Sequence, residues 1–214
     1  MYRNQQELPR LPPRVLEPGG GVMDSLQASR ISGGNSATGR RQSDFYPTPP
    51  EATIALLQFL NLPGETVVWE PACGEGDMVR TIRGFGLHCY GTDINAGQDF
   101  LTYRNEEAFD WIITNPPFAL AEDFIRRAAK TGRPFAMLLK SQYWHAARRV
   151  QLFRDLPPIY VLPLTWRPDF LFKERIGKKG ASPLMDVMWC VWLSPRTRSA
   201  QTVYQPLEKP REVE

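Results

Sequence analysis

Short apolar runs alternate with amphipathic segments through the middle of this chain. The apolar runs have the length and the β-branched and aromatic content of buried strands. We expect strands at 67–70, 87–92, 109–114, 135–140, 159–164 and 187–193. Segments with helical periodicity lie at 49–60, 77–83, 119–130 and 141–154. Strands that alternate with helices predict an α/β fold, with a mostly parallel sheet that helices cover on both faces.

The first predicted helix has a defined start and end. Thr48 and Glu51 have the spacing of a capping box, and Pro49 suits the first helical position. Asn61, which is followed closely by a Pro-Gly pair, predicts the end of the helix. A helix should therefore cover 49–60.

Composition divides the chain into one domain and two polar tails. Residues 1–43 are rich in Pro, Gly, Ser and Arg, so we expect a disordered amino-terminal tail. With 214 residues, 42% of them hydrophobic, the chain can form one full domain, which we place at 44–193. A flexible carboxy-terminal tail is predicted at 194–214. The long insertion at 165–186, before the last strand, is rich in Pro, Gly and Lys and suggests a functional loop.

Several classes of protein are disfavoured. No apolar run approaches the roughly 20 residues of a membrane span, and the amino terminus lacks the pattern of a secretory signal. We therefore expect a soluble cytoplasmic protein without membrane contact. Cys73, Cys89 and Cys190 are widely spaced and form no Cys-x-x-Cys pair, so neither a disulfide framework nor a metal site is predicted.

The net charge of +3 hides an uneven distribution of charge. Acidic side chains outnumber basic ones by six within 44–139, whereas basic side chains outnumber acidic ones by six within 140–180. A concentrated positive charge favours docking of a polyanion such as nucleic acid. A solvated helix face followed by a charged loop explains the same charge equally well.

Glu70-Pro71-Ala72-Cys73-Gly74-Glu75-Gly76 connects a predicted strand to a predicted helix. Glycines at such a turn let a ligand approach the backbone, and the helix amino terminus offers unpaired N–H donors. Asp93, after the next strand, can accept hydrogen bonds from two ribose hydroxyls. A dinucleotide loop needs a third glycine, but Val79 occupies that place. The pattern favours a nucleoside-containing cofactor over a dinucleotide, with a purely structural turn as the alternative.

Asn115-Pro116-Pro117-Phe118 follows another predicted strand. The Asn115 side-chain oxygen and the Pro116 carbonyl can each accept one N–H bond of an exocyclic amine, which directs the nitrogen lone pair toward a methyl donor. Phe118 can stack on a base that has left the duplex. The alternative is a strand-terminating turn with an aromatic plug.

The first of these two motifs resembles the cofactor loop of class I S-adenosylmethionine-dependent methyltransferases. The resemblance implies a Rossmann-like, seven-stranded, mostly parallel sheet and S-adenosylmethionine as cofactor. It places Glu70 and the loop at the methionine end, Asp93 and Ile94 at the ribose and adenine, and Asp99 at the adenine amino group. Tyr46-Pro47-Thr48-Pro49 is similar to a further motif that closes over the methionine. The cofactor residues so implied are Tyr46, Thr48, Pro49, Glu70, Pro71, Ala72, Cys73, Gly74, Gly76, Asp93, Ile94, Asp99 and Phe100.

Asn115-Pro116-Pro117-Phe118 resembles the catalytic motif of adenine amino methyltransferases, and the order of the motifs resembles the gamma group of compact, bacteriophage-type enzymes. This implies methylation of adenine N6 in DNA, in the cytoplasm of a bacterium or a phage-infected host, with Asn115, Pro116, Pro117 and Phe118 as catalytic residues. The same motif occurs in enzymes that methylate RNA or protein glutamine. A non-catalytic nucleic-acid-binding protein is a third interpretation.

The partner that this resemblance implies is duplex DNA with the target adenine flipped out. Gamma enzymes usually carry a separate recognition domain, whereas this chain has only the insertion at 165–186. We expect the side chains that contact nucleic acid to lie within the basic segment. They are Arg148, Arg149, Trp166, Arg167, Lys173, Arg175, Lys178 and Lys179.

Overall fold

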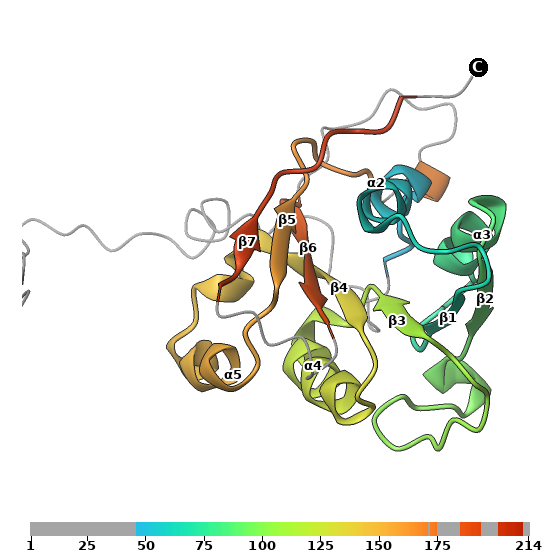
Figure 1. Ribbon diagram of the computed structural model, residues 1–214, viewed down its shortest axis with the longest axis horizontal. Coiled ribbons are helices and arrows are strands. Elements are labelled where there is room, and N and C mark those ends of the chain that lie inside the picture. The colour runs from blue at the N-terminus through green and yellow to red at the C-terminus, as the bar shows by residue number, and fades with distance from the viewer. Residues whose placement is uncertain (1–45, 171, 175–184, 194–200, 212–214) are drawn as a thin grey trace, which may run out of the picture. The chain divides into compact units, whose positions relative to one another are not determined.

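The computed structural model describes residues 46–170, 172–174, 185–193 and 201–211. All of them belong to one compact unit, Ala37–Glu214. The predicted tail at 1–43 and the centre of the insertion, 175–184, lie outside the described residues. Figure 1 shows the arrangement of the described strands and helices.

A seven-stranded sheet in the order β2-β1-β3-β4-β6-β5-β7 forms the centre of the fold. Strands β2, β1, β3 and β4 run parallel to one another, and β7 is parallel to β5. Strand β6 is antiparallel to both β4 and β5. The strands are β1 (Val67–Glu70), β2 (His88–Gly91), β3 (Trp111–Thr114), β4 (Phe135–Lys140), β5 (Tyr160–Pro163), β6 (Val187–Trp192) and β7 (Val203–Tyr204). The predicted α/β fold with a mostly parallel seven-stranded sheet is confirmed.

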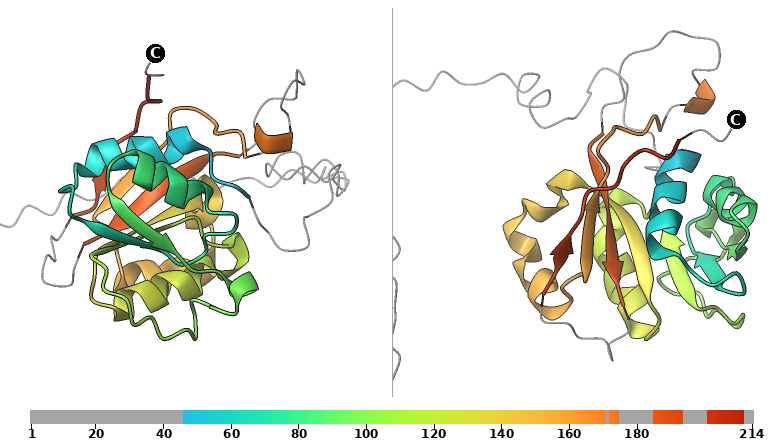
Figure 2. Two further views of the ribbon diagram at one scale, coloured as in Figure 1. Left: turned by 90° about the vertical axis from the view of Figure 1, so that its right-hand side faces the viewer. Right: turned by 45° about the horizontal axis from the view of Figure 1, so that its top comes forward.

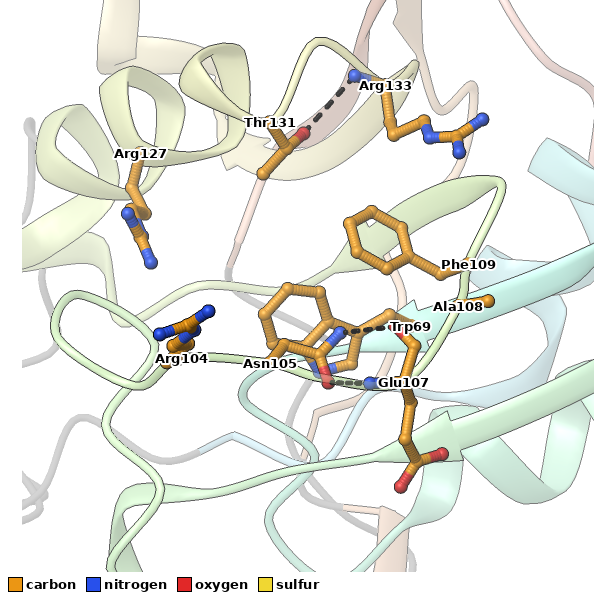
Figure 3. A pocket seen from close by; sticks show the side chains of 9 residues that line it. All are labelled: Trp69, Arg104, Asn105, Glu107, Ala108, Phe109, Arg127, Thr131 and Arg133. Carbon is orange, nitrogen blue, oxygen red and sulfur yellow. Dashed lines mark hydrogen bonds between the residues drawn. The ribbon is translucent and has the colours of Figure 1, made fainter.

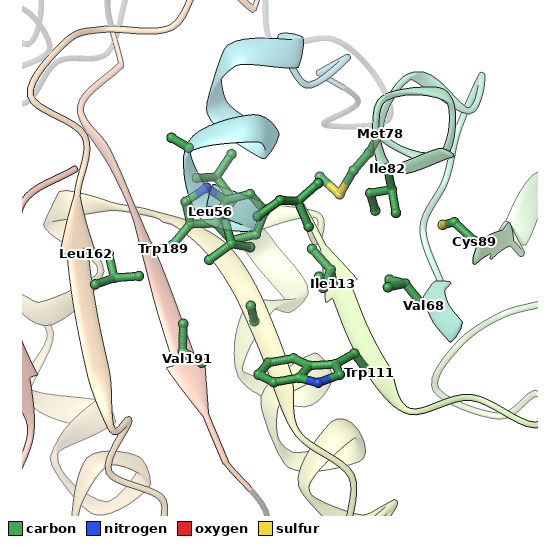
Figure 4. Packing of buried hydrophobic residues seen from close by; sticks show 14 of the residues in the cluster. Leu56, Val68, Met78, Ile82, Cys89, Trp111, Ile113, Leu162, Trp189 and Val191 are labelled. Atoms are coloured by element: carbon green, nitrogen blue, oxygen red, sulfur yellow. The ribbon is translucent and has the colours of Figure 1, made fainter. Parts of the chain in front are cut away.

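Helices cover both faces of the sheet (Figure 2). Helices α2 (Pro50–Leu60) and α3 (Asp77–Gly84) bury Leu56, Met78 and Ile82 against one face, as Figure 4 shows. Helices α4 (Ala121–Lys130) and α5 (Val150–Asp155) pack on the other face through residues such as Phe124 and Leu152. The alternating residues of the buried strands supply both cores, because successive side chains of a strand point to opposite faces.

The capping box predicted for α2 is wrong. Pro49 is the N-cap residue, and no side chain caps the helix. The Thr48 hydroxyl instead accepts a hydrogen bond of 3.1 Å from the side chain of Asn115, a long-range partner that local spacing cannot reveal. The predicted end is confirmed, because Asn61 adopts a left-handed conformation with φ 46° and caps the helix.

The single helix predicted at 141–154 is also wrong. Two 3-10 segments, η3 (Ser141–Trp144) and η4 (Ala147–Arg149), precede the short α5. The Arg149 guanidinium donates a 2.8 Å hydrogen bond to the Tyr143 carbonyl, so a side chain occupies an acceptor that a continuous α-helix would use.

Ordered structure continues past residue 193, where the sequence predicts only a flexible tail. Strand β7 pairs with β5 at the sheet edge. Leu207 is buried in the core, and its carbonyl accepts hydrogen bonds of 3.1 Å and 2.9 Å from the backbone and hydroxyl of Thr165. Strand β7 is only two residues long and lies in a polar stretch, so no apolar run marks it in the sequence.

Gly91 at the end of β2 lies tightly against the loop that follows β1. A Cβ at this position would lie 2.6 Å from the Cys73 Cβ and 2.8 Å from its sulfur. Gly91→Ala should therefore lower the free energy of unfolding by about 1–3 kcal/mol, as overpacking of a tight site does. Gly64→Ala is the control, because a Cβ there meets nothing within 4 Å. Urea denaturation measures both, and equal stability of the two variants would contradict this packing.

Candidate functional site

The loops that follow β1, β2 and β3 enclose a cavity of about 380 Å³ at the carboxyl edge of the sheet. Both sequence motifs line it, together with the segment before α2. Of the predicted cofactor and catalytic residues, Pro49 and Gly76 do not line the cavity. Those that do are Tyr46, Thr48, Glu70, Pro71, Ala72, Cys73, Gly74, Asp93, Ile94, Asp99, Phe100, Asn115, Pro116, Pro117 and Phe118.

Some lining residues are not among the individually predicted cofactor and catalytic residues. They are Pro47, Glu75, Asp77, Met78, Asn95, Leu120 and Phe124. Pro47 and Glu75 lie within the predicted cofactor motifs, Met78 belongs to the first turn of α3, and Leu120 and Phe124 lie just before and within α4. Helical periodicity assigns Leu120 and Phe124 to a core face, and nothing in the sequence shows that this face ends at a cavity.

Asp93 holds the cofactor loop in place. Its carboxylate accepts a 2.8 Å hydrogen bond from the Gly74 N–H and a 2.9 Å bond from the Asn95 N–H. Gly74 and Gly76 have φ values of 49° and 80°, a region that side chains other than glycine rarely adopt. Each carboxylate oxygen keeps a further lone pair, so the Asp93 side chain can accept additional bonds from a ligand.

Glu70 is an unusual acid, since it is only 1% exposed. One carboxyl oxygen accepts a 2.6 Å hydrogen bond from the Thr114 hydroxyl, while the other, Oε2, is buried and has no partner among the described residues. Burial raises the pKa of Glu70 to about 8, although the Thr114 hydrogen bond opposes the shift. The carboxyl group is therefore largely protonated at neutral pH, and a cation beside it would favour the ionised form.

The Asn115 side chain has a defined orientation. Its Nδ2 donates hydrogen bonds of 3.1 Å to the Thr48 hydroxyl and 3.3 Å to the Tyr46 carbonyl. Its oxygen, Oδ1, is buried and accepts no hydrogen bond from the residues that the structure describes. An acceptor at the cavity wall therefore lacks a donor.

Aromatic side chains surround the catalytic motif. The Lys140 ammonium lies 4.4 Å from the centre of the Phe118 ring, a cation–π distance. The Tyr46 ring lies 6.1 Å from Phe118 and 6.4 Å from Phe170, centre to centre. Tyr46 and Phe118 line the same cavity as Asn115, and Phe170 is buried behind Tyr46 in the core.

The remaining cofactor candidates divide between the rim and the core. Ile94 is 64% exposed, so an apolar side chain faces solvent at the rim of the cavity. Asp99 accepts a 3.0 Å hydrogen bond from the Leu101 N–H. Phe100 is buried and packs against Trp69. Burial raises the pKa of the Cys73 thiol to about 11, so this residue is not a ready nucleophile.

The predicted nucleic-acid contacts that lie within the described residues do not form one cluster of unpaired cations. Lys173 binds Glu75 at 2.7 Å and Asp77 at 2.6 Å, which attaches the insertion to the loop after β1 and to the first residue of α3. Arg167 pairs with Asp186, and the Arg149 guanidinium lies over the Tyr143 ring. Arg148 is exposed, and Trp166 packs against the core. Arg175, Lys178 and Lys179 lie outside the described residues.

A second cavity, of about 330 Å³, contains none of the predicted site residues (Figure 3). Arg104, Arg127 and Arg133 line it together with Trp69 and Phe109. Arg127 donates hydrogen bonds of 3.3 Å and 3.1 Å to the carbonyls of the turn that contains Asp99. Arg127 therefore holds the turn whose residues Asp99 and Phe100 line the first cavity.

Neither a metal site nor a membrane span is seen within the described ranges. No group of three or more His, Cys, Asp or Glu side chains there could hold a metal ion. None of the helices seen in those ranges has the length and apolar character to cross a membrane.

Comparison with solved structures defines the fold. A candidate class I S-adenosylmethionine-dependent methyltransferase from Listeria monocytogenes superposes with a TM-score of 0.53 at 13% identity, over 85% of this chain and 71% of that one. A type I restriction-modification methyltransferase subunit from Streptococcus thermophilus matches with a TM-score of 0.48 at 13% identity, over 72% of this chain and 45% of that chain. No protein-family model matches the sequence. The chain therefore has the fold of class I S-adenosylmethionine-dependent methyltransferases.

Glu70 gives a pH test of the cavity. Because its pKa is about 8 in the folded protein and near 4.5 ordinarily, the native state binds the extra proton between these values. The free energy of unfolding should thus fall as pH rises from about 5 to 8, by up to about 1.4 kcal/mol per pH unit. Glu70→Gln should lack this decline. Urea unfolding of both proteins at several pH values measures the difference, and parallel pH profiles would contradict the shifted pKa.

Proposed function

We propose that this protein transfers a methyl group from S-adenosylmethionine to the exocyclic amino group of adenine in DNA. The observation that carries the proposal is a pair of buried oxygens that have no partner among the described residues, on two residues that line one cavity: Glu70 Oε2 and Asn115 Oδ1. A buried polar atom without a partner costs about 1–3 kcal/mol. A ligand cation that ionises Glu70 and donates an N–H to it, and a second N–H donated to Asn115, would recover this cost.

The cofactor supplies one of these donors. S-adenosylmethionine carries an ammonium group at its methionine end, and Glu70 stands at the loop that the sequence motif assigns to this end. A cation there stabilises the carboxylate, so binding at neutral pH should release a proton. Asp93 and Asp99 line the same cavity, and their oxygens suit the ribose hydroxyls and the adenine amino group.

The target amine supplies the other donor. Asn115 Oδ1 and the Pro116 carbonyl would each accept one of its N–H bonds, which localises the nitrogen lone pair. That pair attacks the methyl carbon, the carbon–sulfur bond breaks, and S-adenosylhomocysteine leaves as a neutral thioether. The extra proton on the nitrogen passes to water. Such a transfer needs alignment rather than a strong base, because the sulfonium is a reactive methyl donor.

A planar ring fits the surroundings of Asn115. Phe118 and Tyr46 line the same cavity as Asn115, and stacking on an aromatic ring offsets part of the cost of taking a base out of the duplex. The basic segment at 140–180 favours a polyanionic substrate. These two features support a nucleobase of a nucleic acid as the acceptor.

Asn115→Ala should reduce turnover at least about a hundredfold, because the variant lacks the oxygen that aligns the amine. Its affinity for S-adenosylmethionine should stay within about threefold of the wild type. Transfer of a labelled methyl group into duplex DNA gives the turnover, and calorimetry gives the affinity. Asp93→Ala is the converse control, since it removes the acceptor that holds the loop at Gly74 and should weaken cofactor binding about tenfold to a hundredfold.

The same assay with RNA and with a glutamine peptide tests the choice of substrate. Transfer into either of these in preference to DNA would replace the proposed acceptor. An Asn115→Ala variant that keeps more than about a tenth of the turnover would remove the role assigned to this residue.

Lys178→Ala combined with Lys179→Ala should weaken binding to duplex DNA equally for all sequences. The slope of log affinity against log salt should become shallower by up to about two, because each lysine would neutralise one phosphate. Lys130→Ala combined with Arg133→Ala, outside the basic segment, is the matched control and should leave the slope unchanged. An unaltered slope in the first double variant would place the docking surface elsewhere.

A further inference from the structure

We propose that Thr48 is a positioning residue that fixes the side-chain amide of Asn115. This inference rests on the function proposed above, and assigns Thr48 a task besides contact with the cofactor. The two residues are 67 positions apart in the chain, yet the Thr48 hydroxyl accepts a 3.1 Å hydrogen bond from Asn115 Nδ2. Nothing in the local sequence requires that contact.

The hydrogen bonds define which end of the amide points where. Asn115 Nδ2 has two N–H bonds, directed to the Thr48 hydroxyl and to the Tyr46 carbonyl. A flipped amide would bring Oδ1 against the Tyr46 carbonyl, and two acceptors repel each other. The oxygen accepts no hydrogen bond from a described residue. It therefore remains available to another donor.

Thr48 is well placed to hold this geometry. Its side chain is only 5% exposed, so water competes weakly for the hydrogen bond. The segment that carries it is anchored by the Tyr46 ring, which packs near Phe118 and Phe170. Without the hydroxyl, one buried N–H of Asn115 would lose its acceptor, and the longer 3.3 Å bond to Tyr46 would remain.

The consequence is a link between two parts of the site. The segment 46–48 lines the cavity and also orients the acceptor of the target amine. A change in this segment therefore alters methyl transfer even when the cofactor is bound normally.

Thr48→Val removes the hydroxyl and keeps the shape of the side chain. It should lower kcat about tenfold or more while the Kd for S-adenosylmethionine changes less than about threefold. Thr48→Ser should restore kcat to within about threefold, because it retains the acceptor. The matched control is Thr53→Val, since Thr53 is a buried threonine of the neighbouring helix whose hydroxyl has no described partner.

Two kinetic results would overturn the inference. One is an unchanged kcat in Thr48→Val, and the other is a loss of cofactor affinity as large as the loss of kcat, which would mean that Thr48 acts through the cofactor. Thermal unfolding of all three variants shows whether a loss of kcat is caused by misfolding. Thr53→Val should lose neither kcat nor thermal stability.

A spectroscopic measurement separates this inference from the proposed reaction. In the wild type, the Asn115 side-chain NH₂ protons should exchange slowly with water, and Asn115→Asp identifies their NMR signals by removing them. Exchange should be faster in Thr48→Val than in Thr48→Ser or Thr53→Val. Equal exchange in all variants would overturn the positioning role. Absence of methyl transfer by the wild type on every substrate would contradict the proposed function alone.

Discussion

The candidate site depends on the parallel register of β2, β1 and β3, which brings the ends of three strands to one edge of the sheet. Glu70 at the end of β1 pairs with Gly91 at the end of β2. Two side-chain hydrogen bonds then join the strand ends: Thr114 to Glu70 and the Gly74 N–H to Asp93. A one-residue slip would turn these side chains to the opposite face and dismantle the cavity.

Buried strands and the residues directly after them could be predicted from the sequence, because both are local properties. The apolar runs at 67–70 and 135–140 coincide with β1 and β4. The chemistry proposed for the residues after β1 and β3 follows from residue type, and their proximity follows from the rule that parallel strands end together. For the same reason, most residues of the two motifs line the cavity.

Contacts between distant segments could not be predicted. Thr48 has the right spacing for a helix cap, yet its partner is Asn115. Lys173 looks like a phosphate ligand by charge alone, yet the carboxylates of Glu75 and Asp77 bind it. In each case tertiary structure selects one of several partners that the sequence allows.

The described ends of the insertion are attached to the body of the domain. On one side, Phe170 is buried in the core and Lys173 is bound to the cofactor loop. On the other side, just before β6, the Asp186 carbonyl accepts a hydrogen bond from the N–H of Ser141, which follows β4. The Asp186 carboxylate also accepts a hydrogen bond from Arg167, which joins the two ends of the insertion. The chain therefore enters and leaves 175–184 at two points that contacts with the domain hold in place. A change in the length or composition of this segment starts and ends at the same two positions.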